Sequence, residues 1–221
     1  MKLADIQYFD AEQEVAIRWR HLPHWSQAGT IGFLTWRTKD SIPTHLVDQW
    51  QRERGHWLVE HGIEKSRQDW RGRFAELSPE MQLEYHRLFT DRWDEWLDAG
   101  HGAAVLRRRD LATIVGNSFL HFDGERYLLT DFVVMPTHIH LLAAFPHEDA
   151  MLQQCESWKH FTATQLNRRI SAKGRFWQED DFDHLVRSEL HFEHYRKYIA
   201  ENGPNARLKE DEYLHYSKPL A

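Results

Sequence analysis

The chain has 221 residues, a formal net charge of -6 at pH 7, and a composition that is 41% hydrophobic and 28% charged. This length buries a sizeable core, and one domain with insertions, spanning residues 1–221, is the simplest organisation. A single cysteine, Cys155, excludes a disulfide framework, and no apolar run approaches the roughly 20 residues that cross a bilayer.

The first half of the chain predicts one strand and then a long helical region. Bulky apolar residues follow one another from Thr30 to Arg37 between turn residues, as is typical of a strand. Apolar residues at helical spacing predict a helix from His45 to Glu60. Ser78 and Pro79 form a helix start, with serine as the cap and proline in the first turn. We therefore expect an inserted helical subdomain at about residues 47–100, which holds five of the ten tryptophans.

The second half predicts alternating helices and strands. Helices are expected at residues 111–121, 151–169 and 189–202, strands at 125–135 and 137–145, and a loop or short edge strand at 176–182. Without the insertion, the order is strand, helix, strand, strand, helix, short strand, helix. This order predicts an α+β fold: a ferredoxin-like, four-stranded antiparallel sheet with helices on one face.

Two histidines flank one apolar residue in the strand expected at residues 137–145. Side chains alternate along a strand, so His138 and His140 point the same way and Ile139 points the other way. Two imidazoles on one face can hold a divalent cation. A chain with 16 histidines could also contain such a pair by chance, as two surface residues.

The helix expected at residues 189–202 carries a phenol and an amide four residues apart. Tyr198 and Asn202 therefore share one face of that helix. Together with the two histidines they would place a metal beside a nucleophilic hydroxyl, an arrangement suited to phosphoryl transfer. Tyr195 is the rival nucleophile, but its neighbour four residues on is Ile199, which cannot bind metal.

Five segments in order carry a resemblance to a known family. The first is the strand at Ile31–Arg37 with Asp40–Pro43, and the second is Val134–Leu142 with the two histidines. The other three are Ser157–Thr162 (SWKHFT), Phe176–Gln178 (FWQ) followed by Phe182–Asp183, and Tyr198–Asn202 (YIAEN). In order and approximate spacing the chain resembles the HUH single-tyrosine transposases, in particular the REP-associated tyrosine transposases (RAYTs). The resemblance covers about residues 30–207.

This resemblance implies an activity, a cofactor and a substrate. His138, His140 and Asn202 would bind Mg2+ or Mn2+, and Tyr198 would cleave single-stranded DNA near hairpin-forming repeats, leaving a 5'-phosphotyrosine. The family tends to continue Asn-Pro-Val, whereas this chain reads Asn202-Gly203-Pro204; an inserted Gly203 would shift the helix end, and Glu201 would then be a substitute ligand. Histidine and neutral oxygen donors also admit Zn2+, Ni2+ or Co2+ by affinity alone.

The net charge of -6 opposes a nucleic-acid partner, because phosphate contacts drive DNA affinity. The basic residues, however, outnumber the acidic ones between Cys155 and Arg175. We expect DNA contacts from Arg37, Lys159, His160, Arg168 and Arg169, with Lys159 and Arg168 on the backbone. Trp177 is the first choice for stacking on a base and Trp36 the second; each basic cluster could also be an ordinary solvated helix face.

Two other functions remain open. A histidine-triad nucleotide hydrolase would need a third histidine where the chain has Leu142. A non-cleaving, domesticated hairpin-binding protein would keep the fold without the chemistry. The lack of a signal peptide and of an apolar span predicts a cytoplasmic protein without membrane contact. The resemblance implies a bacterial, nucleoid-associated protein that acts as a monomer or a homodimer.

Overall fold

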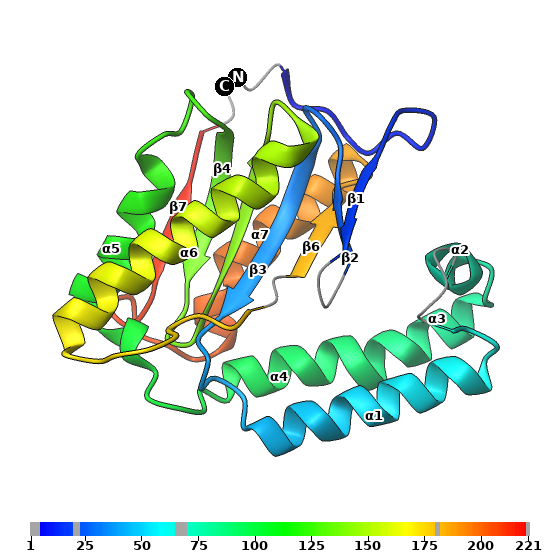
Figure 1. Ribbon diagram of the computed structural model, residues 1–221, viewed down its shortest axis with the longest axis horizontal. Coiled ribbons are helices and arrows are strands. Elements are labelled where there is room, and N and C mark those ends of the chain that lie inside the picture. The colour runs from blue at the N-terminus through cyan, green and yellow to red at the C-terminus, as the bar shows by residue number, and fades with distance from the viewer. Residues whose placement is uncertain (1–4, 20–22, 65–69, 180–181, 220–221) are drawn as a thin grey trace. The chain divides into compact units, whose positions relative to one another are not determined.

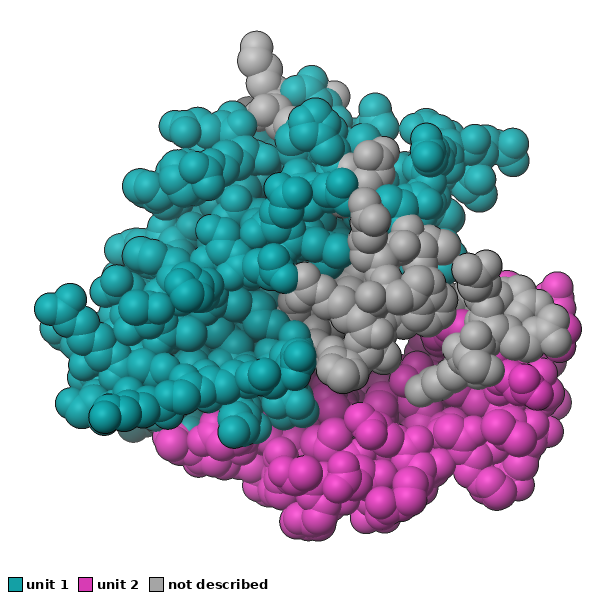
Figure 2. Space-filling model, viewed as in Figure 1, with its two compact units in different colours: residues 1–39, 104–221 teal, residues 40–103 magenta. Residues whose placement is uncertain are grey.

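The computed structural model of the protein describes residues 5–19, 23–64, 70–179 and 182–219. The chain divides into two compact units (Figure 2). Unit 1 comprises residues 1–39 and 104–221, and unit 2 comprises residues 40–103. The helical insertion expected at about residues 47–100 falls within unit 2, which begins and ends a few residues further out.

Unit 1 is built on a five-stranded sheet in which every neighbouring pair is antiparallel. Its strands are β3 (Ile31–Arg37), β4 (Leu128–Val134), β5 (His138–Ala144), β6 (Phe182–Leu185) and β7 (Leu214–Ser217). The spatial order is β6-β3-β5-β4-β7. Without β7, the order β6-β3-β5-β4 is that of a ferredoxin-like sheet, which confirms the predicted fold class.

The fifth strand is a difference from the predicted sheet of four. β7 follows the last helix and pairs with the outer edge of β4, with Asp131 opposite Ser217. It has four residues that alternate between half-buried and exposed. A segment this short and this weakly apolar cannot be distinguished from a loop by the periodicity of its hydrophobic residues. The edge strand expected at residues 176–182 lies further on, at β6.

The helices of unit 1 cover both faces of the sheet, which corrects the prediction of helices on one face (Figure 1). α5 (Arg109–Leu120) and α6 (Glu148–Ile170) lie on one face, and α7 (Glu189–Asn205) lies on the other. The physical reason is visible in the strands: all residues of β3, β4 and β5 are buried. A sheet whose two faces are both apolar must bury both.

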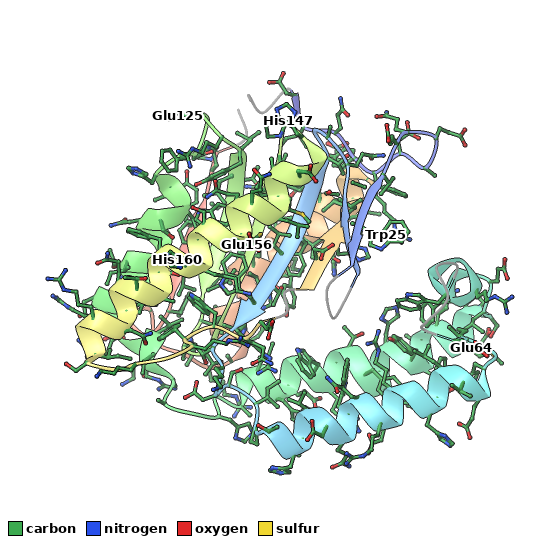
Figure 3. The ribbon with its side chains drawn as sticks, viewed as in Figure 1. Trp25, Glu64, Glu125, His147, Glu156 and His160 are labelled. Atoms are coloured by element: carbon green, nitrogen blue, oxygen red, sulfur yellow. The ribbon has the colours of Figure 1, made fainter. Side chains whose placement is uncertain are left out.

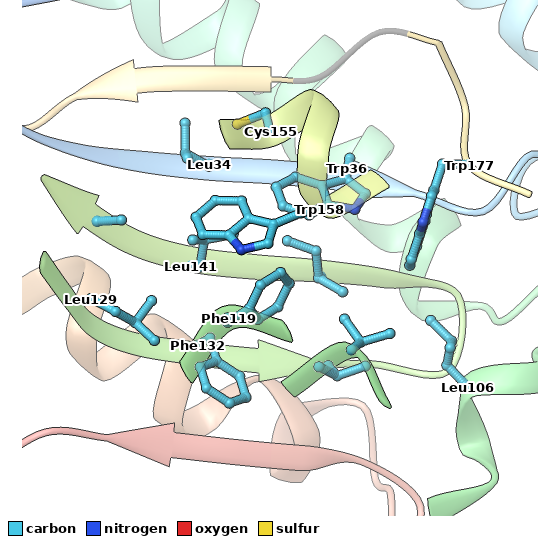
Figure 4. Close-up of a cluster of buried hydrophobic side chains, with 14 of the residues drawn as sticks. Leu34, Trp36, Leu106, Phe119, Leu129, Phe132, Leu141, Cys155, Trp158 and Trp177 are labelled. Atoms are coloured by element: carbon cyan, nitrogen blue, oxygen red, sulfur yellow. The ribbon is translucent and has the colours of Figure 1, made fainter. Parts of the chain in front are cut away.

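The larger of the two cores lies between the sheet and helices α5 and α6. Trp36, Phe119, Phe132 and Trp158 meet there edge to face or stacked (Figure 4). The indole Nε1 of Trp158 donates to the backbone oxygen of Ser118 at 3.0 Å, so the largest side chain of α6 is buried without leaving its polar atom unpaired. This core holds α6 and α5 against the side of the sheet away from α7.

Two short elements complete unit 1. β1 (Ala16–Trp19) and β2 (Pro23–Ser26) form a separate antiparallel pair, and a 3-10 turn, η3 (Val105–Arg107), leads into α5. None of the helices within the described part of the chain is long and apolar enough to span a membrane.

Unit 2 is helical. Its elements are α1 (Thr44–Glu60), α2 (Trp70–Ala75), α3 (Pro79–Tyr85), the π-helical segment η2 (His86–Asp91) and α4 (Arg92–Asp98). The predicted helix start is confirmed, because Ser78 Oγ accepts a hydrogen bond from the Met81 backbone at 3.3 Å. Trp57, Leu58 and Phe89 lie in its own small core.

Two helical glycines give a matched stability test. A Cβ at Gly116 in α5 would lie 2.6 Å from Leu214 and 3.2 Å from the Phe132 ring, whereas a Cβ at Gly55 in α1 meets nothing within 4 Å. We expect Gly116→Ala to lower the free energy of unfolding by about 1–3 kcal/mol through overpacking. Gly55→Ala should raise it by about 0.5–1 kcal/mol.

Urea unfolding followed by circular dichroism measures both variants. Equal effects of the two substitutions would show that the close approach of α5 to β4 and β7 does not depend on the missing side chain of Gly116.

Candidate functional site

His138 and His140 lie on the face of β5 that is covered by α7. Their neighbours Ile139 and Leu141 belong to the core beneath α5 and α6, on the opposite face. Both histidines are buried, with 1% and 2% of their surface exposed, and their ring centroids are 4.8 Å apart. The alternation expected from the sequence therefore places the two imidazoles side by side within the protein, and the reading as surface histidines is wrong.

A threonine hydroxyl lies within hydrogen-bond distance of the Nδ1 atom of each ring. Thr35 lies directly opposite His140 in the β3–β5 pairing, and its Oγ1 is 2.7 Å from His140 Nδ1. Thr137 Oγ1 is 3.2 Å from His138 Nδ1. When the Nδ1–H of a histidine donates to such a partner, its Nε2 lone pair is left for a metal. Thr35 is not predictable as a site residue from the sequence, because only the register of β3 and β5 places it opposite His140.

Burial keeps the two imidazoles neutral. Desolvation lowers the pKa of His138 to about 3, although the interaction with the Asn202 side chain opposes this shift. Desolvation also lowers the pKa of His140 well below its ordinary value, and the neighbouring His138 lowers it further. A neutral imidazole is the form that binds a metal, so both rings are in the ligand state at neutral pH.

α7 brings Tyr198 and Asn202 to the histidine pair. The Tyr198 ring meets the His140 ring edge to face at a centroid distance of 5.2 Å. Asn202, one turn further along, is 4% exposed, and its Oδ1 is buried without a hydrogen-bond partner among the described residues. Its side chain interacts with His138, and a buried amide oxygen beside a pair of neutral imidazoles is a donor set that fits a divalent cation.

The end of α7 does not shift at Gly203. The helix continues through Pro204 to Asn205, so Asn202 keeps its helical position four residues after Tyr198. Gly203 instead leaves space for the Tyr213 ring, because a Cβ at this position would lie 2.5 Å from that ring. This close approach of Tyr213 explains a glycine near the end of the helix.

Glu201 does not face the histidine pair. It is exposed, and its carboxylate lies 3.8 Å from Lys197 Nζ on the same helix. Within the part of the chain that the structure describes, no group of three or more His, Cys, Asp or Glu side chains could hold a metal ion. The position of Glu201 therefore does not support it as a substitute ligand, and Asn202 is the oxygen donor of α7 that lies beside His138.

Tyr195, the rival nucleophile, is separated from His140 by a phenylalanine. The Phe33 ring stacks on His140 at 5.3 Å and on Tyr195 at 4.2 Å, with interplanar angles of 14° and 11°. Tyr198 meets both Phe33 and His140 edge to face. Of the two tyrosines, Tyr198 is therefore the one whose ring contacts a histidine of the pair.

A buried ion pair fixes α7 to the sheet beside the site. Arg196 Nε lies 3.1 and 3.2 Å from the two carboxylate oxygens of Asp131 on β4, which is 1% exposed. Arg196 Nη2 also donates to Ser217 Oγ at 2.9 Å, and that hydroxyl donates to Asp131 at 2.5 Å. The network ties α7 to β4 and β7 at Arg196, which lies two residues before Tyr198.

The residues expected to bind DNA do not form one surface. Arg37 lies opposite His138 in the β3–β5 register and is 6% exposed, so it belongs to the histidine side of the sheet. Trp177 and Trp36 are 3% and 2% exposed core residues, and Trp177 Nε1 donates to Thr162 Oγ1 at 2.8 Å. Both indoles are packed in the core, so the expectation that they stack on bases is corrected.

Four of the expected DNA-binding residues lie on α6, across the sheet from the histidines. His160 projects from α6 (Figure 3), and with Lys159 it lines an open groove of about 790 Å3 beside residues 174–179. Lys159 Nζ donates to the Glu179 backbone oxygen at 2.9 Å. Arg168 and Arg169 are exposed in the last turn, where Arg169 lies 3.4 Å from Asp110.

The Arg196–Asp131 network gives a stability prediction with a matched control. Asp131→Ala leaves the largely buried guanidinium of Arg196 without its carboxylate, and we expect the free energy of unfolding to fall by about 3 kcal/mol. Asp110→Ala removes the exposed pair with Arg108, 2.9 Å long, and should cost about 1 kcal/mol or less. Urea unfolding of the two variants measures the difference, and similar losses would contradict the role given to Asp131.

Comparison with known proteins gives one structural likeness. No protein-family model matches the chain, and no curated protein matches it. A solved structure of a REP-associated tyrosine transposase bound to a REP hairpin is similar to this chain at 14% identity and a TM-score of 0.41. The match covers 85% of this chain and 73% of the transposase chain. The same family is the one that the sequence segments resemble, and the match assigns no residue role.

Proposed function

We propose that this chain is a metal-dependent, single-stranded DNA endonuclease and strand transferase of the transposase type. The observation that supports this proposal is the placement of Tyr198 and Asn202, one turn apart on α7, against the buried pair His138 and His140. A phenol beside a neutral nitrogen and oxygen donor set suits nucleophilic attack on a phosphodiester. Hairpin-forming repeats as the substrate follow from the sequence resemblance.

The proposed cofactor is Mg2+ or Mn2+, held by the Nε2 atoms of His138 and His140 and by Asn202 Oδ1. When bound, such an ion neutralises charge on the phosphate and polarises its oxygens. Thr35 fixes the ring of His140 through its 2.7 Å contact with Nδ1. Arg37, across the strand pair from His138, adds a positive charge on the same side of the sheet.

Tyr198 acts as the nucleophile. Its phenolic oxygen forms a bond to phosphorus, the bond between phosphorus and the 3' oxygen breaks, and the phenol proton is lost while the leaving oxygen gains one. The products are a 5'-phosphotyrosine and a free 3'-hydroxyl. A second 3'-hydroxyl reverses the step and joins new ends, so that no nucleotide is consumed.

The first test is formation of a covalent adduct. Single-stranded DNA from the sequence flanking the protein's own gene is incubated with the protein and Mn2+, or with a chelator, and adducts are resolved on a denaturing gel. We expect a metal-dependent adduct that Tyr198→Phe abolishes and Tyr195→Phe retains, because only the Tyr198 ring contacts His140.

The same assay distinguishes the non-cleaving alternative. Binding of a hairpin by the wild-type protein without any adduct would identify a DNA-recognition protein and contradict the proposed chemistry. An adduct that persists in Tyr198→Phe and disappears in Tyr195→Phe would transfer the nucleophile to Tyr195.

A second prediction tests the metal site without DNA. Thr35→Val keeps the shape of the side chain but removes the partner of His140 Nδ1, and we expect Mn2+ affinity to fall about 10–100-fold, the usual effect of losing an outer-shell partner. Titration followed by electron paramagnetic resonance measures free Mn2+. Thr130→Val is the control, since Thr130 is also buried, on β4, and its hydroxyl makes only a 3.4 Å contact with the Leu142 backbone. Equal affinities in the two variants would contradict the site.

A further inference from the structure

A row of rings leads from the histidine pair along α7, and the proposed chemistry does not use it. His140 stacks on Phe33, and Phe33 stacks on Tyr195. Tyr195 in turn meets His191 at a centroid distance of 4.6 Å and an interplanar angle of 37°. The row therefore continues from the site toward the start of α7, where Ser188 caps the helix.

Two more histidines flank this row. His184 on β6 lies directly opposite Phe33 on β3, which puts it on the α7 side of the sheet. Its ring centroid is 5.4 Å from His191 and 6.1 Å from Tyr195, and that of His194 is 5.8 Å from Tyr195. His184, His191 and Tyr195 are half-buried and His194 is exposed. These rings thus differ from the fully buried aromatic residues on the other face of the sheet.

An open hollow lies along the same part of α7. Its volume is about 620 Å3, and it is lined by Ser188, Leu190, His191, Glu193, His194 and Lys197. Lys197 immediately precedes Tyr198, so the hollow reaches the turn of the helix that carries the proposed nucleophile. The side chains that border it include two imidazoles, the apolar Leu190, and one cation and one carboxylate whose charges balance.

His191 offers a neutral ring to this hollow. Desolvation lowers its pKa, and the positive charge of Arg187 and the neighbouring His194 lower it further. The Arg187 backbone nitrogen donates to His191 Nδ1 at 3.3 Å, which holds the ring orientation. A neutral ring held in place suits stacking better than it suits attraction of a phosphate.

We propose that His184, His191, His194 and Tyr195 form a stacking site for bases of single-stranded DNA beside the reacting phosphate. This inference rests on the proposed function and names the position at which the single strand is held. Along the helix axis His191 lies about 10.5 Å from Tyr198, which is about three nucleotides at a stacked spacing of about 3.4 Å. Stacking accepts any base, so the site holds the strand without reading its sequence.

The test compares two DNA probes that differ only in their bases. One probe is a hairpin with single-stranded flanks of about six thymidines, and the other is the same hairpin with abasic flanks. Fluorescence anisotropy gives the Kd of each for Tyr198→Phe protein, which cannot cleave. We expect the abasic probe to bind about 5–150-fold more weakly, the equivalent of about 1–3 kcal/mol per stacked base.

Variants in the same Tyr198→Phe background assign this difference to the rings. His191→Ala combined with His194→Ala removes two of the four rings and should lower the Kd ratio of the two probes toward one, whereas Phe at both positions should preserve it. His121→Ala removes an exposed histidine that contacts Phe122 at the end of α5, on the other face of the sheet, and should leave the ratio unchanged. A thermal melt of each variant confirms that it is folded.

An unchanged ratio in the double alanine variant, or a ratio of one in the parent, overturns the stacking site. The adduct assay on the wild-type protein is independent of this result. If an adduct forms but the two probes bind equally well, the proposed chemistry stands and the stacking site is wrong. If the abasic probe binds more weakly but no adduct forms, the stacking site stands and the proposed chemistry is wrong.

Discussion

Two fully buried imidazoles on one face of the sheet are the constraint on which the rest of the site depends. A buried polar group costs free energy unless it has a partner, and each ring has two nitrogens to satisfy. β3 supplies Thr35 to one ring, and the turn before β5 supplies Thr137 to the other. On the α7 side, the Asn202 side chain lies beside His138, and its Oδ1 has no hydrogen bond to the described residues. A sheet face that carries such a pair needs a polar group on the helix above it, and the Asn202 side chain supplies one beside His138.

This requirement explains why α7 is held by charged and steric contacts as well as by apolar packing. Phe192 and Ile199 bury the helix in the second core, but apolar contacts alone tolerate small rotations. Arg196 and Asp131 fix the rotation through directed hydrogen bonds, and their cost of desolvation is offset by Ser217. β7 therefore contributes to the site although none of its residues contacts the histidines: it supplies the hydroxyl that completes the ion pair and lies beside β4.

The parts of this site that were predictable from sequence are those governed by local geometry. Alternation along β5 gives the shared face of His138 and His140, and helical spacing gives that of Tyr198 and Asn202. Sequence could not show that α7 covers the face opposite α6, because alternation separates two faces without saying which helix lies on each. The expected DNA residues of α6 and those of the histidine site consequently fall on opposite sides of the sheet. The position of Trp177 was not predictable for a related reason: a tryptophan in a loop can return to the core, as its burial and its contact with Thr162 show.

The distribution of charge bears on how such a site could hold DNA. Residues 40–103 contain 13 acidic and 8 basic side chains, and therefore carry -5 of the formal charge of -6. Unit 1, which contains the histidine pair and α7, is left with -1. A nearly neutral unit gains little from long-range attraction or from counterion release. The affinity for a single strand that we propose must then come from short-range contacts, and base stacking is the short-range contact that depends least on net charge. The half-buried rings beside Tyr198 meet that requirement better than the arginines at the end of α6, one of which already pairs with Asp110.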